Sequence, residues 1–392
     1  MLQSGVMTKP IRSNLAVVVS LVWVPLVTAP AALAQSIVPT TTQWIRNTGG
    51  QVGYGGILAN VTLVRHSTNY VYPSSTGIPS YSIGPWAGNP NVPANQNWVF
   101  RIAKNPVVAT SPTATPLGTI GVLSNGVPFF NALDAMSYNN QNIWHRDAMY
   151  WEAASFDACK GHPAPGGVYH PHQFPLCVIP TDAQHHSPII GWAFDGFPIY
   201  GPYGYLNADG SGGIARMRTS YRTRAITQRT TLPDGTQLPA NQYGPAVSTQ
   251  YPLGCFVEDY EFVNGLGELN VHNARFSVTP EYPQGQWCYF STIAANGATQ
   301  YPYLVGPRYL GTLVTGNTGP GGGHVSPTDS PVTFTGAACP ADLNGNRTVD
   351  SADLGVLLSA WGVSGGGSDI DRDGQIGAGD LTLLLAAWGA CN

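Results

Sequence analysis

The chain has 392 residues, of which 10% are charged, with 21 Asp and Glu against 17 Lys and Arg. Seven aspartates and two arginines follow position 338, so the negative excess is concentrated at the C-terminal end. The absence of a basic patch argues against nucleic acid and anionic membranes as partners. Many Gly, Pro and Tyr residues predict short strands joined by ordered turns.

Residues 1–34 have the organisation of a secretory signal peptide. Lys9 and Arg12 precede an apolar stretch that runs from Leu15 to Leu26, and Ala32-Leu33-Ala34 fits a cleavage site. No later segment approaches the roughly 20 apolar residues of a membrane-spanning helix. We therefore expect a protein that is exported, without a membrane span, and either secreted or held at the cell surface.

Residues 35–311 are expected to form a mainly β body. Asn125-Gly126 and Asp195-Gly196 each separate two apolar runs, as in a two-residue hairpin turn. Further strands are expected at 97–102, 275–279 and 286–293, and a helix at 147–156. The predicted fold class is a large antiparallel-β body, either sandwich or barrel, followed by a small α-helical C-terminal module.

Six cysteines on an exported chain are expected to form disulfides. Cys339 and Cys391 bracket the C-terminal module and are expected to pair. The other four allow three connectivities. The arrangement Cys159–Cys177 with Cys255–Cys288 is favoured because each bond would close a short local loop.

Five of the nine histidines lie between positions 162 and 186. In an extended segment His170 and His172 project to the same side, so both can bind one ion. His162 and His186 complete the candidate set, and imidazole ligands favour zinc or copper. The alternative is that these side chains only satisfy buried backbone groups in a loop-rich fold.

The sequence around this cluster resembles the YHYH family, whose Tyr-His-x-His element appears here as Tyr169-His170-Pro171-His172. The third residue of that element is usually Tyr and is Pro in this chain. The likeness covers most of residues 95–310 and includes Trp144-His145, Asp195-Gly196 and Glu258-Asp259-Tyr260. It implies a domain boundary but no particular reaction.

Residues 312–338 have the Gly, Pro and Ser content of a flexible linker. After them comes a repeat with a period of 27 residues, expected to form a calcium module over residues 339–392. The oxygen-bearing side chains of the two copies match the spacing of calcium loops. They are Asp342, Asn344, Asn346, Asp350 and Asp353 in the first loop, and Asp369, Asp371, Asp373 and Asp380 in the second.

After each loop an apolar stripe follows, first Leu354, Leu357, Leu358 and Trp361, then Leu381, Leu384, Leu385 and Trp388. The helical spacing predicts two helices that bury these stripes against each other. The module resembles a type I dockerin, including the ending Gly389-Ala390-Cys391. It departs from that family at Arg347, where the loop usually has Gly. The resemblance implies two Ca²⁺ ions and docking to an extracellular protein or cell-surface partner.

Three functions follow from these features. The first is a surface-displayed protein whose body binds a transition metal and whose tail attaches it to a partner. The second is a metal-dependent hydrolase or copper oxidase that acts on an extracellular polymer. The third is a non-enzymatic glycan-binding module, with Trp192 or Tyr203 in contact with the sugar.

Overall fold

The computed structural model describes Met1, Gly5 and residues 38–179, 182–335, 340–341, 343, 348–364, 367–371 and 373–390. The predicted signal peptide therefore lies almost entirely outside the described residues. So do the Cys339–Cys391 pair and three predicted calcium ligands, Asp342, Asn344 and Asn346. Within the described ranges, no helix is long and apolar enough to cross a bilayer.

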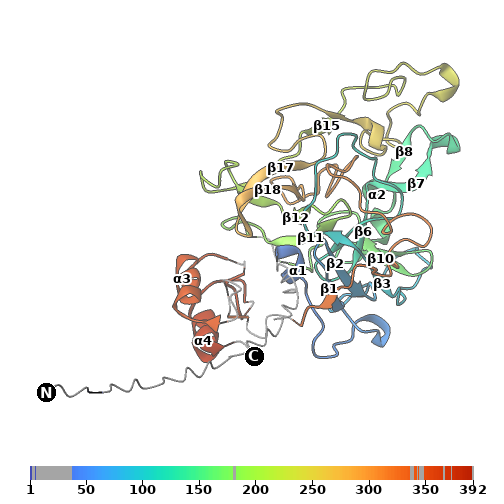
Figure 1. Ribbon diagram of the computed structural model, residues 1–392. Helices are drawn as coiled ribbons and strands as arrows, with labels where there is room; N and C mark the ends of the chain where they lie inside the picture. The colour runs from blue at the N-terminus through green and yellow to red at the C-terminus, as the bar shows by residue number, and fades with distance from the viewer. Residues whose placement is uncertain are drawn as a thin grey trace. The chain divides into compact units, whose positions relative to one another are not determined.

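The body contains a six-stranded sheet in which strands far apart in the sequence are neighbours (Figure 1). Its order is β17-β18-β12-β11-β5-β6, and every neighbouring pair is antiparallel except β12 and β18. The strands are β5 (Thr119–Leu123), β6 (Pro128–Phe130), β11 (Ile189–Ala193), β12 (Pro198–Tyr200), β17 (Ala274–Thr279) and β18 (Tyr282–Phe290).

Both predicted hairpins are present in this sheet. Gly126 and Gly196 have φ angles of 81° and 91°, which glycine adopts without the steric cost that a Cβ atom imposes. Asn125 and Asp195 each accept a bond from the backbone N–H two residues later, at 3.2 Å in both cases. Local turn chemistry therefore determines both hairpins.

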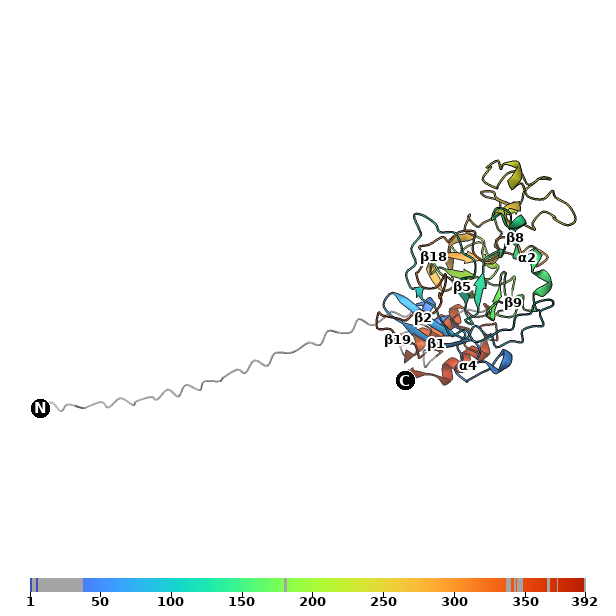
Figure 2. The same ribbon diagram turned by 90° about the vertical axis from the view of Figure 1, so that its right-hand side faces the viewer.

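A five-stranded sheet, part of which is visible in Figure 2, has the order β19-β1-β2-β3, with β4 also paired to β2. Its strands are β1 (Val61–His66), β2 (Tyr70–Ser75), β3 (Trp98–Val99), β4 (Ile102–Ala103) and β19 (Val332–Thr333). The strand β19 lies within residues 312–338, for which the composition predicts a flexible linker. The N–H of Val314 also bonds to the carbonyl of Phe194 at 2.9 Å, so the described part of this segment, residues 312–335, is attached to the body.

Smaller elements complete the body. The two-stranded pairs are β7 (Leu133–Ser137) with β8 (His145–Asp147), β9 (Gly161–Ala164) with β10 (Val168–Pro171), β13 (Tyr203–Tyr205) with β14 (Ile214–Arg216), and β15 (Tyr221–Thr223) with β16 (Tyr260–Phe262). The helices are α1 (Pro39–Thr42) and α2 (Ala148–Trp151), with 3-10 turns at Tyr54–Gly56, Tyr138–Asn140, Ala153–Ser155, Ala240–Gln242 and Val257–Asp259.

The two larger sheets share one hydrophobic core. It joins Val64 and Phe100 of the five-stranded sheet region to Ile120, Trp192 and other side chains of the six-stranded sheet. Trp192 is fully buried, and its ring centroid lies 4.3 Å from that of Trp44. Trp192 is therefore a core residue and is not placed to contact a glycan.

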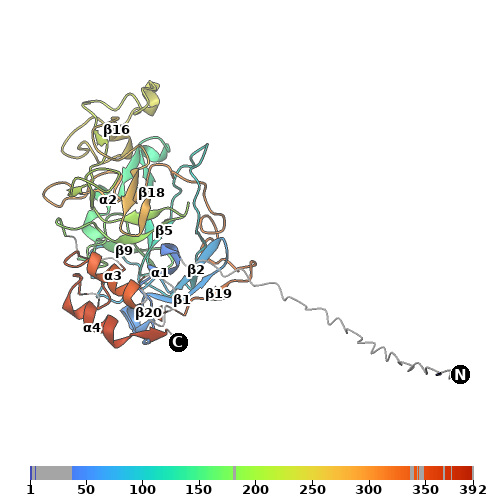
Figure 3. The ribbon, with the colours of Figure 1, turned by 60° about the vertical axis from the view of Figure 1, so that its left-hand side comes forward.

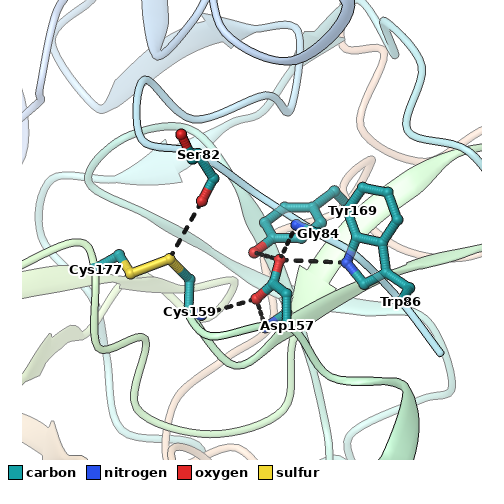
Figure 4. Close-up of a disulfide and its surroundings, with 8 residues drawn as sticks. Ser82, Gly84, Trp86, Asp157, Cys159, Tyr169 and Cys177 are labelled. Atoms are coloured by element: carbon teal, nitrogen blue, oxygen red, sulfur yellow. Dashed lines mark hydrogen bonds between the residues drawn. A yellow bond between two sulfur atoms is a disulfide. The ribbon is translucent and has the colours of Figure 1, made fainter.

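The structure contains one of the two favoured disulfides of the body. Cys159 and Cys177 are bonded, with their Cα atoms 5.2 Å apart (Figure 4). The predicted Cys255–Cys288 bond is wrong, since both are free, buried thiols. Cys255 packs with Trp144 and Phe256, whereas Cys288 lies in the core of the large sheets, so their packing in different clusters keeps them apart.

The C-terminal repeats form a small helical unit (Figure 3). Its helices, α3 (Ser351–Ser359) and α4 (Ala378–Ala386), contact each other, and β20 (Thr348–Val349) pairs with β21 (Gly389–Ala390). Val349 is the partner of Gly389. Ile376 is the residue of the second repeat that corresponds to Val349, and Gly362 corresponds to Gly389. The carbonyl of Ile376 accepts a bond from the N–H of Gly362 at 2.8 Å, so each repeat bonds to the other at the same position.

The apolar stripes of the two helices are buried only in part. Leu357 and Leu384 are fully buried in a core that also contains Val349 and Ile376. The last two residues of each stripe are 45–52% exposed, which corrects the prediction that both stripes are buried between the helices. They are Leu358 and Trp361 in the first repeat, and Leu385 and Trp388 in the second.

Candidate metal centre

A β-hairpin brings three predicted histidines together. In the antiparallel pair β9–β10, His162 lies directly opposite His170. His172 follows two residues later and therefore returns to the same side of the extended chain. One nitrogen of each histidine lies within 4.8 Å of the corresponding nitrogens of the other two, and all three residues are buried.

The hydrogen-bond partners of the Nδ1 atoms determine the tautomers of His170 and His172. Nδ1 of His170 faces the carbonyl of Val168 at 3.0 Å, and Nδ1 of His172 faces that of Asn131 at 2.5 Å. A carbonyl only accepts, so both Nδ1 atoms carry a hydrogen when the rings are neutral. Each Nε2 atom then has a free lone pair, as in a metal ligand.

His162 follows the same rule through a hydroxyl group. Its Nδ1 lies 2.7 Å from Oγ of Ser155, which donates its own hydrogen to the carbonyl of Glu152 at 2.8 Å. The hydroxyl oxygen therefore accepts from Nδ1, and Nε2 of His162 is also left with its lone pair.

Burial favours the neutral form of His162 and His170. Burial, followed by the neighbouring His172, lowers the pKa of His162 to about 4. Burial also lowers the pKa of His170 well below its ordinary value. The proton that would compete with a cation is thus disfavoured at neutral pH.

The spacing of the Nε2 atoms fits one shared ion. The distance is 3.1 Å from His162 to His170 and 3.1 Å from His170 to His172. Neutral lone pairs that face each other at this distance repel unless a cation lies between them. With metal–nitrogen bonds of about 2.0–2.1 Å, this separation corresponds to roughly 100° at the ion, between the octahedral and tetrahedral angles.

A carboxylate that the sequence prediction missed also lies at the centre. Glu152, at the end of α2, places Oε2 3.1 Å from Nε2 of His172 and 3.6 Å from Nε2 of His162. This oxygen is buried and forms no hydrogen bond with any described group. When the rings are neutral, this oxygen faces imidazole lone pairs instead of donors, and a cation between them would remove the repulsion. The sequence does not single out Glu152, because Asp147 and Asp157 lie five residues to either side of it.

His186 is not brought to this centre. Its Nδ1 faces the carbonyl of Ser187 at 2.7 Å, and its ring contacts the rings of Tyr200, Tyr205 and Phe290. Adjacency in sequence to a histidine-rich segment suggested it as a ligand, but the chain turns away into the six-stranded sheet.

The hairpin is held by Asp157 and the disulfide (Figure 4). Oδ1 of Asp157 accepts from the N–H groups of Cys159 and Gly161 at 2.9 and 3.1 Å, and Oδ2 accepts from the hydroxyl of Tyr169 at 3.0 Å. A Cβ atom at Gly161 would approach the Tyr169 ring to 2.4 Å, so only glycine fits there. The three histidines all lie inside the loop closed by Cys159–Cys177.

A cavity of about 500 Å³ adjoins the histidines. Its walls include Glu152 and all three histidines, together with Asp134, Phe130 and Trp151. An ion held by the histidines would therefore be reachable from this cavity by a small molecule, as in sites that keep a coordination position open.

Next to this cavity, His145 and Glu258 form an ion pair across 113 residues of sequence. Nδ1 of His145 lies 2.6 Å from the carboxylate of Glu258, and Nε2 lies 3.0 Å from Oδ1 of Asn142. Both ring nitrogens thus face acceptors, and the bond to Glu258 is the main cause that raises the pKa of His145. The pair is a charged link between β8 and the turn at Val257–Asp259.

In the C-terminal unit, three predicted calcium ligands come together. Carboxylate oxygens of Asp369, Asp371 and Asp373 lie within 4.8 Å of one another and could hold a metal ion. Gly374 follows with a φ of 93°, the left-handed conformation expected of this loop position. Asp380 instead accepts from the backbone N–H groups of Ile370 and Gly377, at 2.5 and 2.7 Å.

The described part of the first loop shows helix capping. The side chain of Asp350 accepts from the N–H of Ala352 at 2.7 Å, and Asp353 accepts from the N–H of Asp350 at 2.9 Å. This reciprocal arrangement begins α3 and is a capping box.

The fold and the centre define a β-rich protein with three buried, converging histidines. A sequence model of the family described as YHYH protein matches residues 99–302, more than half of the chain, and the chain belongs to this family. No curated protein and no solved structure matches.

Proposed function

We propose that this chain is an exported protein whose body holds one transition-metal ion through His162, His170 and His172, with Glu152 as a fourth ligand. The observation that carries the proposal is the convergence of three Nε2 atoms beside the buried Oε2 of Glu152. A nitrogen-rich set with one carboxylate favours zinc or copper. The Cys159–Cys177 bond supports an extracytoplasmic location.

Elemental analysis tests the metal centre. Chain purified without added metal is incubated with zinc or copper and then dialysed, and we expect one ion of one element per chain. His170→Gln should abolish this stoichiometry, whereas His324→Gln should keep it, because His324 is exposed and outside the cluster. Retention of the full stoichiometry by His170→Gln would contradict the proposal.

For the C-terminal repeats, we propose calcium binding and docking to an extracellular partner. The clustered carboxylates of Asp369, Asp371 and Asp373 support the first part. Exposed side chains at equivalent places of both repeats, Trp361 and Trp388, support the second. Calcium retention by the full chain, measured after dialysis with and without chelator, tests the first part.

A metal-dependent reaction is a second candidate, favoured by the cavity of about 500 Å³ that adjoins the histidines. An open coordination position could activate water or oxygen for attack on an extracellular polymer. Turnover that is lost in His172→Gln and on chelation would support it, whereas turnover unaffected by both would exclude the metal from the reaction.

A further inference from the structure

The charged side chains that line the cavity beside the histidines are both acidic. They are Asp134 and Glu152, and no Lys or Arg lines this cavity in the part of the chain that the structure describes. A divalent ion on three neutral histidines contributes two positive charges, and the two carboxylates offset both. At the cavity wall itself, an anion that enters would therefore meet no positively charged side chain.

The carboxyl group of Asp134 lines the cavity and has two charge-favouring contacts. Its Oδ1 accepts from the N–H of Met136 at 2.7 Å, and its Oδ2 lies 3.9 Å from Nη1 of Arg146. Both interactions favour the carboxylate. Burial and then the Glu152 charge raise the pKa of Asp134, and a bound metal ion would oppose this shift. Arg146 itself stacks over the Trp151 ring at 4.3 Å.

The amide nitrogens of Asn89 and Asn91 in the cavity wall already donate to neighbouring groups. Nδ2 of Asn89 donates to the carbonyl of Pro163 at 2.8 Å, and its Oδ1 accepts from Nδ2 of Asn91 at 2.9 Å. Much of the remaining wall is apolar, with Phe130 and Trp151 among its members. Asp134 therefore offers an acceptor to a ligand that brings hydrogen-bond donors and an apolar face.

We infer that the cavity binds a neutral organic molecule at the metal, one that carries a hydroxyl or amide donor, and discriminates against anions through Asp134. The inference rests on the proposed metal centre. The cavity volume of about 500 Å³ lies in the range of small-molecule sites, about 300–1,000 Å³.

Cobalt provides the test, because its visible spectrum responds to a change of ligand. The cobalt-loaded full chain is titrated at pH 8 with imidazole, a neutral probe, and with azide, an anionic probe of similar size. We expect imidazole to bind more tightly. Asp134→Asn keeps the side-chain size and removes one negative charge, so it should raise azide affinity about tenfold and should not raise imidazole affinity. Asp234→Asn, on an exposed loop, is the matched control.

The outcomes separate the two proposals. Cobalt that does not bind at all would overturn the metal centre and this inference with it. Cobalt that binds, with azide as tight as imidazole in the natural chain, would overturn the inference and leave the metal centre intact. The comparison of probes on the natural chain does not depend on Asp134→Asn folding.

Discussion

At the residue scale, the position of Glu152 leads to a sharp prediction. Glu152→Gln preserves volume but removes the anionic oxygen beside the histidines. Metal affinity should fall at least tenfold, since even the loss of an outer hydrogen-bond partner costs about 10–100-fold. Competition with a coloured chelator measures the affinity. Glu261→Gln, which changes a surface pair with Arg222, should have no effect.

The second prediction concerns His186 and the effect of pH on the stability of the folded chain. Burial lowers the pKa of His186 to about 4. Between pH 6.5 and pH 4, His186 is therefore protonated in the unfolded chain and neutral in the folded chain. The folded state therefore loses stability as the pH falls from 6.5 to 4, by roughly 3 kcal/mol from this residue. His186→Phe should flatten this part of the profile in chemical unfolding.

A profile between pH 4 and pH 6.5 that is as steep in His186→Phe as in the natural chain would contradict this assignment. Above pH 6.5 both states are neutral at this residue, so no difference in slope is expected there.

The residues of the centre could be predicted from the sequence only where they share a strand. His170 and His172 follow from the alternation of an extended segment, and His162 joins them by pairing across β9–β10. Glu152 comes from the end of a short helix, and its approach to the centre depends on tertiary packing. His186 shows the converse, because closeness in sequence did not become closeness in space.

At the scale of elements, local chemistry predicts turns better than it predicts sheets. Asn125-Gly126 and Asp195-Gly196 determine two hairpins because their conformational preferences act within four residues. The parallel pairing of β12 with β18 joins segments about 90 residues apart and has no local signal. The pairing of β19 with β1 was likewise not predicted, because the Gly- and Pro-rich composition of residues 312–338 indicated a linker.

The β9–β10 hairpin and its disulfide lead to the third prediction. Cys159 and Cys177 close a loop of 18 residues that contains all three histidines. Replacing both with Ser should cost about 3 kcal/mol of stability, by the loop-entropy estimate. Without the disulfide the three histidines are held less rigidly relative to one another, so the metal affinity should also fall. Thermal unfolding and chelator competition measure the two effects.

Cys255→Ser is the control for this variant, because Cys255 is a buried, free thiol outside the disulfide loop. It should keep the metal affinity of the natural chain. Equal affinity in the natural chain and in the disulfide-free variant would show that packing alone, including the bonds to Asp157, holds the hairpin.

At the scale of the whole molecule, the body and the C-terminal unit have separate hydrophobic cores. The body core joins two large sheets, while the C-terminal unit relies on Ala341, Val349, Leu357, Ile376 and Leu384. The five side chains buried in the described part of this unit form a small core, so an ion should contribute a larger share of its stability. The repeat made this unit predictable, although only one residue of each apolar stripe is fully buried.

Two cores and two chemically different sites predict two independent responses to metal. In calorimetry of the full chain, calcium at 100 times its dissociation constant should stabilise the C-terminal unit by about 2.7 kcal/mol and leave the body unchanged. Zinc or copper should shift the body transition instead. Carboxylates prefer calcium and imidazoles prefer the transition metals, so the two shifts should not interchange.

A pair of matched variants completes the calcium prediction. Asp371 and Asp209 each accept a bond at Oδ1 from the N–H two residues later, at 3.1 and 2.9 Å, so Asn should preserve the local turn at both positions. Only Asp371 lies in the carboxylate group with Asp369 and Asp373. Asp371→Asn should therefore reduce the calcium shift, and Asp209→Asn should keep it. A calcium shift that survives Asp371→Asn undiminished would mean that the stabilising ion binds elsewhere, because the second loop would then have lost a charged ligand without consequence.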